Sequence, residues 1–313
     1  MLRFGKTFAS MLMMFGLGLV GVAQAAPAKR LALVQVNQQA LYFTQITQGA
    51  QAAAKAAAAE LVVFNANDNP SAQNDAIEAY IQDKVDAILV CAIDVNGIKP
   101  AVSAAVQAGI PVVAIDAVLN GDNQVQIGVD NRAAARQLGE YTGSYITREL
   151  DGVAKVGVVG ALGSYVQNLR LDGFREGLAQ SAPKAKIVGT VDGNNVQDTA
   201  QSAAENLLTA NPDLQIVYAT GEPALIGTVA ASVAQGSGER TRIFGWDLSP
   251  QAVQGLDDGS VAVVVQQNTR GMGKAAVEAA LALLAGQQVT KQQDIPVTLV
   301  TRENLDSYRA EFK

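Results

Sequence analysis

Histidine is absent from the chain, and its absence excludes several classes of enzyme. Serine–histidine hydrolases and the usual zinc enzymes need an imidazole, and histidine is also the commonest general base. An enzyme with this sequence would have to work with carboxylates.

Cysteine is nearly absent as well. Cys91 is the only one, and it lies in the apolar run AILVC, where we expect it to be a small buried hydrophobe. A single thiol cannot form an internal disulfide, so the stability of the protein must come from a packed core. The 313 residues suffice for two domains with substantial cores.

The chain also lacks an apolar run long enough to span a membrane. The longest, over residues 8–22, has about 15 residues where a spanning helix needs roughly 20. Arg3 and Lys6 precede it, and Ala23-Gln24-Ala25 follows with the small-x-small pattern that signal peptidase cuts after. We therefore expect residues 1–25 to be a cleavable signal peptide that directs the protein to the periplasm, and an uncleaved anchor is the alternative.

Basic residues are fewer than acidic ones. Without Arg3 and Lys6, 21 basic residues remain against 29 acidic ones, a net charge of −8. This balance argues against nucleic acid, and against an anionic membrane surface, as a partner. It suits a soluble protein of the periplasm.

Two strings look like nucleotide-binding loops and fail on closer reading. The GxGxxG string at 16–21 lies inside the expected signal peptide, with no strand before it. Near Gly273-Lys274, the first glycine of a phosphate loop is replaced by Asn268, and its serine or threonine by Ala275. We expect no nucleotide and no other cofactor.

Short β-branched runs alternate with longer alanine-rich segments from Lys29 onward. The predicted strands cover 31–36, 60–66, 87–91, 111–115, 125–129, 154–160, 185–191, 214–219, 241–246 and 261–267, with helices such as 44–59, 71–83, 97–108 and 197–210 between them. This alternation indicates an α/β protein with parallel sheets covered on both faces. The number of units favours two lobes, and the lack of a proline- or serine-rich linker favours a chain that crosses between them several times.

Polar and aromatic side chains cluster where the predicted strands end, which is where open parallel sheets bind ligands. The candidate ligand-binding residues are Tyr42, Phe43, Asp116, Asn168, Arg170, Glu222, Trp246, Asp247 and Gln267. Carboxylates, amides and an arginine suit a polyhydroxylated ligand, whose ring can also stack on an aromatic side chain. Two alternatives stay open: the aromatic residues could belong to the core, and Asp247 could cap a helix that begins near Ser249.

Several short strings occur in a familiar order and spacing. They are YFTQITQGAQ (42–51), IPVVAID (110–116), GVDN (128–131), NLRLDGF (168–174), ENLLTANPD (205–213) and FGWD (244–247), with Gln267 at the end of a strand. Together they resemble the ribose-binding-protein family of type I periplasmic binding proteins, from about Arg30 to Val300.

The resemblance implies a fold and a function. It implies two doubly wound lobes joined by a three-segment hinge, one holding 26–129 and 268–298, the other 130–267 and 299–313. It also implies the solute-binding component of an ABC importer, a monomer that delivers a monosaccharide or polyol to membrane permease subunits.

By the same resemblance, Tyr42 and Phe43 stack on the sugar ring. Asp116, Arg170, Asp247 and Gln267 are its polar contacts.

The ligand itself stays open because the chain departs from the ribose pattern at Ala40, Ala117, Gly221 and Asn195. Another pentose, a hexose, a furanose form or a polyol are all compatible with it.

Three other functions are alternatives to transport. A sensory adaptor that presents its ligand to a membrane receptor fits the same fold. A glycosidase could use Asp116, Glu222 and Asp247, because two carboxylates suffice for that chemistry. A repressor of the lactose type would need a DNA-binding helix-turn-helix where the signal peptide lies, and a different charge.

Overall fold

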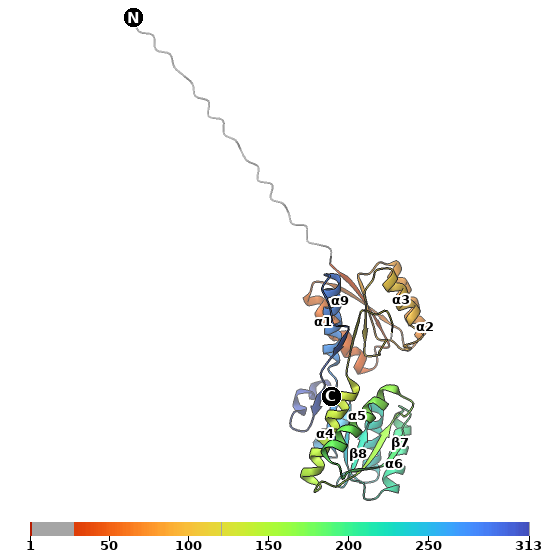
Figure 1. Cartoon of the computed structure of the whole chain (residues 1–313), viewed down its shortest axis with the longest axis vertical. Helices are drawn as coiled ribbons and strands as arrows, with labels where there is room; N and C mark the ends of the chain where they lie inside the picture. Colours follow the sequence, from red (N-terminus) through yellow and green to blue (C-terminus); the bar gives the residue numbers. More distant parts are fainter. Residues whose placement is uncertain (2–27, 120, 313) are drawn as a thin grey trace.

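The structure is a computed structural model that describes Met1, residues 28–119 and residues 121–312 (Figure 1). Met1 apart, the expected signal peptide lies outside the described residues. Within them, no helix has both the length and the apolar character that a membrane crossing requires.

The first lobe is built on a six-stranded parallel sheet in the order β11-β5-β4-β3-β1-β2. Its strands are β1 (Arg30–Gln35), β2 (Glu60–Asn65), β3 (Ala87–Val90), β4 (Val112–Ile115), β5 (Val125–Gly128) and β11 (Gln292–Asp294). The four central strands are almost entirely buried. Burial on both faces explains why they are nearly continuous apolar runs.

Helices cover both faces of this sheet. Helices α1 (Leu41–Ala56) and α9 (Thr269–Leu284) pack on one face, where Ile46 and Met272 meet Leu33. Helices α2 (Pro70–Gln82) and α3 (Lys99–Gln107) pack on the other, over Val34. Alternate residues of β1 thus enter opposite cores, as the two-residue period of a strand requires.

The second lobe repeats the plan with a sheet in the order β12-β10-β9-β8-β6-β7, parallel except for β12. Its strands are β6 (Lys155–Gly160), β7 (Lys186–Asp192), β8 (Ile216–Ala219), β9 (Arg242–Trp246), β10 (Val261–Gln266) and β12 (Thr298–Val300). Helices α4 (Asn131–Glu149) and α5 (Tyr165–Ser181) cover one face. Helices α6 (Gln197–Ala210), α7 (Glu222–Ala234) and α8 (Pro250–Asp258) cover the other.

The chain passes between the sheets three times, between β5 and α4, between β10 and α9, and between β11 and β12. Figure 1 shows the two lobes one above the other, with these connections between them. The two-lobed α/β fold is therefore confirmed. Where the chain hinges, predicted at 129/130, 267/268 and 298/299, stays a prediction.

Residues 305–312 connect the two lobes through contacts with each of them. The short 3₁₀ helices η1 (Leu305–Ser307) and η2 (Arg309–Glu311) belong to the second lobe, whose core includes Leu305 and Phe312. From there the carboxylate of Glu311 accepts hydrogen bonds from Gln45 Nε2 and Arg270 Nη1 of the first lobe, both at 2.7 Å.

Glycines let helices α1 and α9 approach closely. A side chain at Gly49 would overlap the carbonyl oxygen of Arg270, and one at Gly273 would overlap that of Ile46. Because only hydrogen fits at these two positions, α9 lies directly against α1 and the first lobe is closed by a segment from near the end of the chain.

Candidate functional site

Asp116 and Asp247 occupy equivalent places in the two lobes. Each directly follows a central strand, β4 or β9, and each has the left-handed backbone that non-glycine residues rarely adopt, with φ of 66° and 63°. Their backbone N–H groups still donate to the neighbouring strand, to Ile127 O at 2.7 Å and Val265 O at 2.9 Å. Backbone strain of this kind persists only where the surroundings enforce it, and it concentrates at ligand-binding sites.

A buried glutamine on the next strand fixes the chain after each aspartate. Gln126 Oε1 accepts a hydrogen bond from Leu119 N at 3.1 Å, and Gln266 Oε1 accepts one from Leu248 N at 2.8 Å. The loops that follow the two aspartates are therefore held in the same way. Gln126 could not be recognised from the sequence, because it lies within a strand and not at its end.

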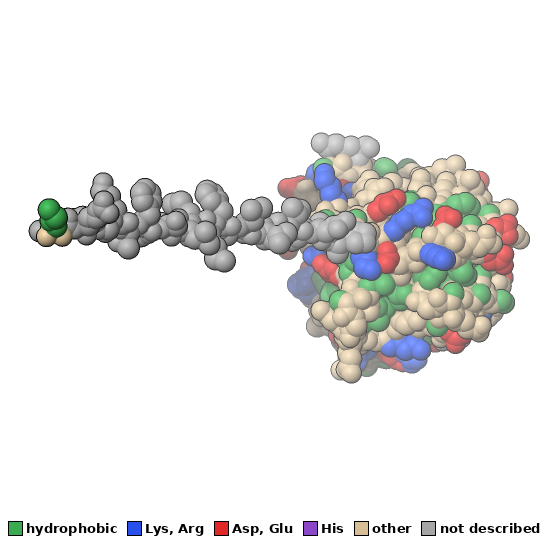
Figure 2. Space-filling model, turned by 90° about the horizontal axis from the view of Figure 1, so that it is seen from above, with side chains coloured by type: hydrophobic (Ala, Val, Ile, Leu, Met, Phe, Trp, Pro, Cys, Tyr) green, Lys and Arg blue, Asp and Glu red, His purple; other side chains and the backbone are tan. Residues whose placement is uncertain are grey.

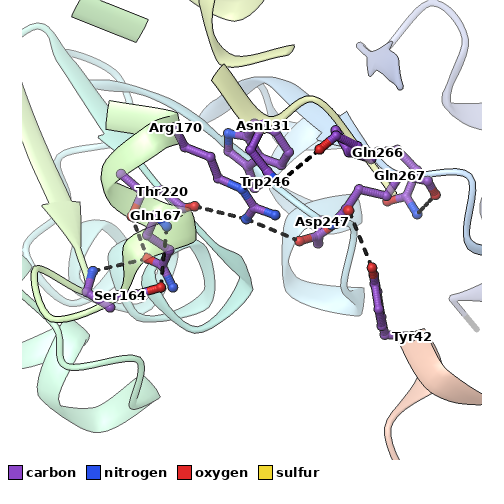
Figure 3. Close-up of polar contacts among 12 residues, drawn as sticks. Tyr42, Asn131, Ser164, Gln167, Arg170, Thr220, Trp246, Asp247, Gln266 and Gln267 are labelled. Carbon is purple, nitrogen blue, oxygen red and sulfur yellow. Dashed lines mark hydrogen bonds and ion pairs between the residues drawn. The ribbon is translucent and has the colours of Figure 1, made fainter. Parts of the chain in front are cut away.

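Arg170, on helix α5, is the buried cation of the site. Its Nε donates to Asn131 Oδ1 at 2.8 Å and its Nη1 donates to Thr220 O at 3.1 Å (Figure 3). Nη1 also lies 3.9 Å from a carboxylate oxygen of Asp247. A guanidinium has five N–H donors, so three of them have no hydrogen-bond acceptor within the described part of the chain.

The indole of Trp246 packs against one face of this guanidinium. The central carbon of the guanidinium lies 3.7 Å from the centroid of the indole, a cation–π contact. The indole has no exposed surface, and its N–H donates to the hydroxyl of Tyr218 at 3.0 Å. Tyr218 in turn stacks on Phe174. In this conformation a ligand would meet Arg170 and not Trp246, contrary to the direct contact that we predicted for the indole.

Gln267 links the aspartate of the second lobe to the first lobe. Its Nε2 donates to Asp247 Oδ1 at 2.8 Å, and its Oε1 lies 3.5 Å from the hydroxyl of Tyr42 on α1 (Figure 3). Gln267 lies in a crossing between the lobes and contacts one residue of each. Ser249, and not Asp247, caps helix α8 by accepting from Ala252 N.

Tyr42 and Phe43 lie in the first turn of helix α1 and are half-buried against the core of the first lobe. Their rings meet edge to face, with centroids 5.2 Å apart. Both side chains therefore belong partly to the core, which was the alternative to ligand binding, and each keeps some exposed surface for a ligand.

Another predicted residue, Asn168, is hydrogen-bonded near its own loop. Asn168 donates its side-chain N–H to Leu162 O at 2.9 Å, in the loop before α5. Its neighbour Gln167 is more buried and accepts from Thr220 Oγ1 at 2.6 Å, while its Nε2 donates to Asn195 at 2.8 Å. Gln167 thus fixes the loop edge beside Arg170, a role that the sequence did not reveal.

The carboxyl groups of the site resist ionisation. Burial raises the pKa of Asp247, partly offset by the nearby charge of Arg170 and the hydrogen bond from Gln267. Burial likewise raises the pKa of Asp116, against the effect of the Tyr42 hydroxyl and Arg170. Glu222 begins helix α7 and is partly open to solvent, yet the surrounding protein and the negative charge of Asp247 raise its pKa to about 7. In the described chain, no cluster of three or more metal-ligating side chains is present.

A family profile described as a periplasmic binding protein domain matches residues 31–288. The chain belongs to this periplasmic binding protein family. A relative of this binding protein, the D-ribose/D-allose-binding protein of Pseudomonas aeruginosa, is 31% identical over 297 residues, which cover 89% of this chain and 91% of the relative. The ribose import binding protein of Bacillus subtilis is 28% identical over 264 residues, 84% of each chain. The family resemblance is confirmed.

Solved structures agree with this binding-protein fold. An ABC transporter periplasmic solute-binding protein from Actinobacillus succinogenes, with bound D-allose, superposes with a TM-score of 0.79. It is 25% identical, and the match covers 90% of this chain and all of that one.

Proposed function

We propose that this protein binds a monosaccharide or a related polyol between its two lobes and delivers it to the permease of an ABC importer. The observation that carries the proposal is the guanidinium of Arg170, buried on the indole of Trp246 and beside Asp247, with three N–H donors unused by the described protein atoms. Sugar hydroxyls both accept from such donors and donate to carboxylates. The relatives named for ribose and allose support this class of ligand.

Each residue then has a distinct task. Asp116 and Asp247 accept hydrogen bonds from hydroxyls, one from each lobe, and Arg170 donates to ring or hydroxyl oxygens. Tyr42 and Phe43 pack on the apolar face of the ring. Gln267 contacts the ligand from the hinge, Glu222 and Asn168 line the outer part of the site, and Trp246 positions Arg170.

Binding from two lobes couples the ligand to their motion. A ligand held by Asp116 and Asp247 together stabilises the conformation in which these residues are closest. In this proposal the lobes comprise residues 26–129 with 268–298 and 130–267 with 299–313. The mature protein, released after residue 25, acts in the periplasm as a monomer.

The test is a titration of protein that has been unfolded and refolded to remove any ligand carried from the cell. Calorimetry with a panel of pentoses, hexoses and polyols should identify at least one that binds in the micromolar range or tighter, about 8 kcal/mol of binding free energy. Small-angle scattering should then show a smaller radius of gyration in the complex. If no member of the panel binds, the proposal fails. Release of phenol from aryl glycosides would favour the hydrolase instead.

A further inference from the structure

A cavity lies at the end of the second lobe opposite to Asp247 and the other candidate ligand-binding residues. It has a volume of about 440 Å³ and runs along the edge where β6, β7, β8 and β9 begin. In a parallel sheet this is the edge opposite the ligand-binding one. Nothing in the proposed sugar-binding function uses it.

Basic side chains dominate the lining of this cavity. They are Lys155, Lys184, Lys186 and Arg240, against a single acidic residue, Asp213. Asp213 is paired with Lys155 at 2.5 Å, and the other three cations have no ion pair with any described residue. All of them are exposed, so they are free to meet a ligand.

At the corresponding edge of the first lobe, the basic side chains lie beside acidic ones. There Lys29 pairs with Asp86 at 2.8 Å, and Arg30 lies 3.7 Å from Glu60 and 3.9 Å from Asp83. Figure 2, which looks onto the first lobe from above, shows basic and acidic side chains side by side around the point where the chain enters. The two lobes share one plan, so the excess of positive charge in the second lobe does not follow from the fold.

This excess stands out further because the protein as a whole is acidic. Positive charges gathered in a concave site raise the local concentration of anions even when the net charge is negative. The lining also contains the apolar side chains of Val153, Ala154 and Leu214, with Val153 half exposed. The neighbouring acidic residues Asp151 and Glu239 are not part of the lining.

We propose that this cavity is an anion site that binds a phosphate group, with Lys184, Lys186 and Arg240 as its ligands and Asp213 as a competitor for Lys155. Arginine and lysine are the side chains that recognise phosphate, the one through its planar fork and the other as a point charge. The phosphate could belong to a free anion or to the headgroup of an anionic lipid. The net negative charge of the protein argues against an anionic membrane as a partner of its surface as a whole. It does not argue against a membrane contact at this basic end of the second lobe.

The two sources are separated by two probes. Inorganic phosphate, which carries no sugar and does not compete for the cleft, is titrated by calorimetry at low ionic strength. Vesicles of phosphatidylglycerol are compared with vesicles of phosphatidylcholine in a flotation assay. Binding to phosphate indicates a free anion, and binding to phosphatidylglycerol alone indicates a headgroup.

The variants test the cavity itself. One basic residue near an anionic surface changes the affinity of a protein for that surface about fivefold. The double variant Lys184→Glu with Lys186→Glu should therefore bind the phosphate or phosphatidylglycerol probe at least roughly twenty-five-fold more weakly. Asp213→Asn should strengthen this binding about fivefold, because it frees Lys155. Lys55→Glu with Lys291→Glu, both exposed on the first lobe, changes the net charge equally and should have little effect.

Sugar binding should be unchanged in all three variants, which shows that they fold and keeps this test independent of the proposed function. The proposal is overturned if the wild-type protein binds neither probe at low ionic strength. It is equally overturned if the first-lobe control loses as much binding as the cavity variant.

Discussion

Removing Arg170 is the most direct test of the ligand site. In Arg170→Ala the carbonyl of Thr220 and the side chain of Asn131 lose their donor, and Asp247 loses its nearby positive charge. The three N–H groups left for the ligand disappear as well. A hydrogen bond to a charged group contributes about 1.5–3 kcal/mol, or roughly ten- to a hundred-and-fifty-fold in affinity. If the ligand uses two of the three, the loss is at least about a hundredfold.

Arg170→Lys separates charge from geometry. A lysine keeps a positive charge near Asp247, but a single ammonium group cannot donate to Asn131, to Thr220 and to the ligand in one plane. We expect an intermediate loss, about tenfold or more by calorimetry. Emission of Trp246, the only tryptophan, should change in both variants because its ring loses the guanidinium stacked on it.

If Arg170→Ala retains the wild-type circular dichroism spectrum and binds the sugar within about threefold of the wild-type affinity, the ligand does not lie against this guanidinium.

Two further predictions concern stability. The pKa of Glu222 is raised from 4.5 to about 7, so the folded state binds this proton more tightly than the unfolded state does. The contribution of the protonated Glu222 to the free energy of unfolding is therefore complete below pH 4.5 and is lost as the pH rises through 7. The melting temperature of the ligand-free protein should fall over this range, and the fall should be smaller in Glu222→Gln; equal slopes in both proteins would contradict the assignment. Gly49→Ala should destabilise the protein by about 1–3 kcal/mol because the new methyl group overlaps the carbonyl of Arg270, although alanine is the better helix former. Gly163→Ala, which enters open space, should change the stability by less than about 0.5 kcal/mol, and a Gly49 variant as stable as this control in thermal unfolding would disprove the close packing.

Most of the fold could be predicted because buried parallel strands are apolar throughout. Ten predicted strands are present, with ends that differ by one or two residues. The strands β11 and β12 were missed because each has three residues, and polar ones in β11. They form strands because a neighbouring edge offers hydrogen bonds, which no local pattern reveals.

The sequence could place the candidate residues at strand ends and no further. Asp116, Asp247 and Gln267 do directly follow β4, β9 and β10, whereas Arg170 lies on helix α5 near Asp247; their role in binding stays a prediction. The sequence could not tell that Trp246 is fully buried behind Arg170, because that depends on how α5 packs on the sheet.

The route of the chain also sets the order in which the protein can fold. Helix α9 supplies Met272, Ala276 and Val277 to the core of the first lobe, and β11 completes its sheet from residues 292–294. A nascent chain that has been synthesised only as far as β10 therefore carries one face of its first sheet partly uncovered, however long it waits. Such a chain stays incompletely folded until nearly all of it has been made, which is the state that a translocation channel for unfolded polypeptides requires. Under the export proposed above, the crossings between the lobes would in this way also delay the folded state until after passage through the membrane.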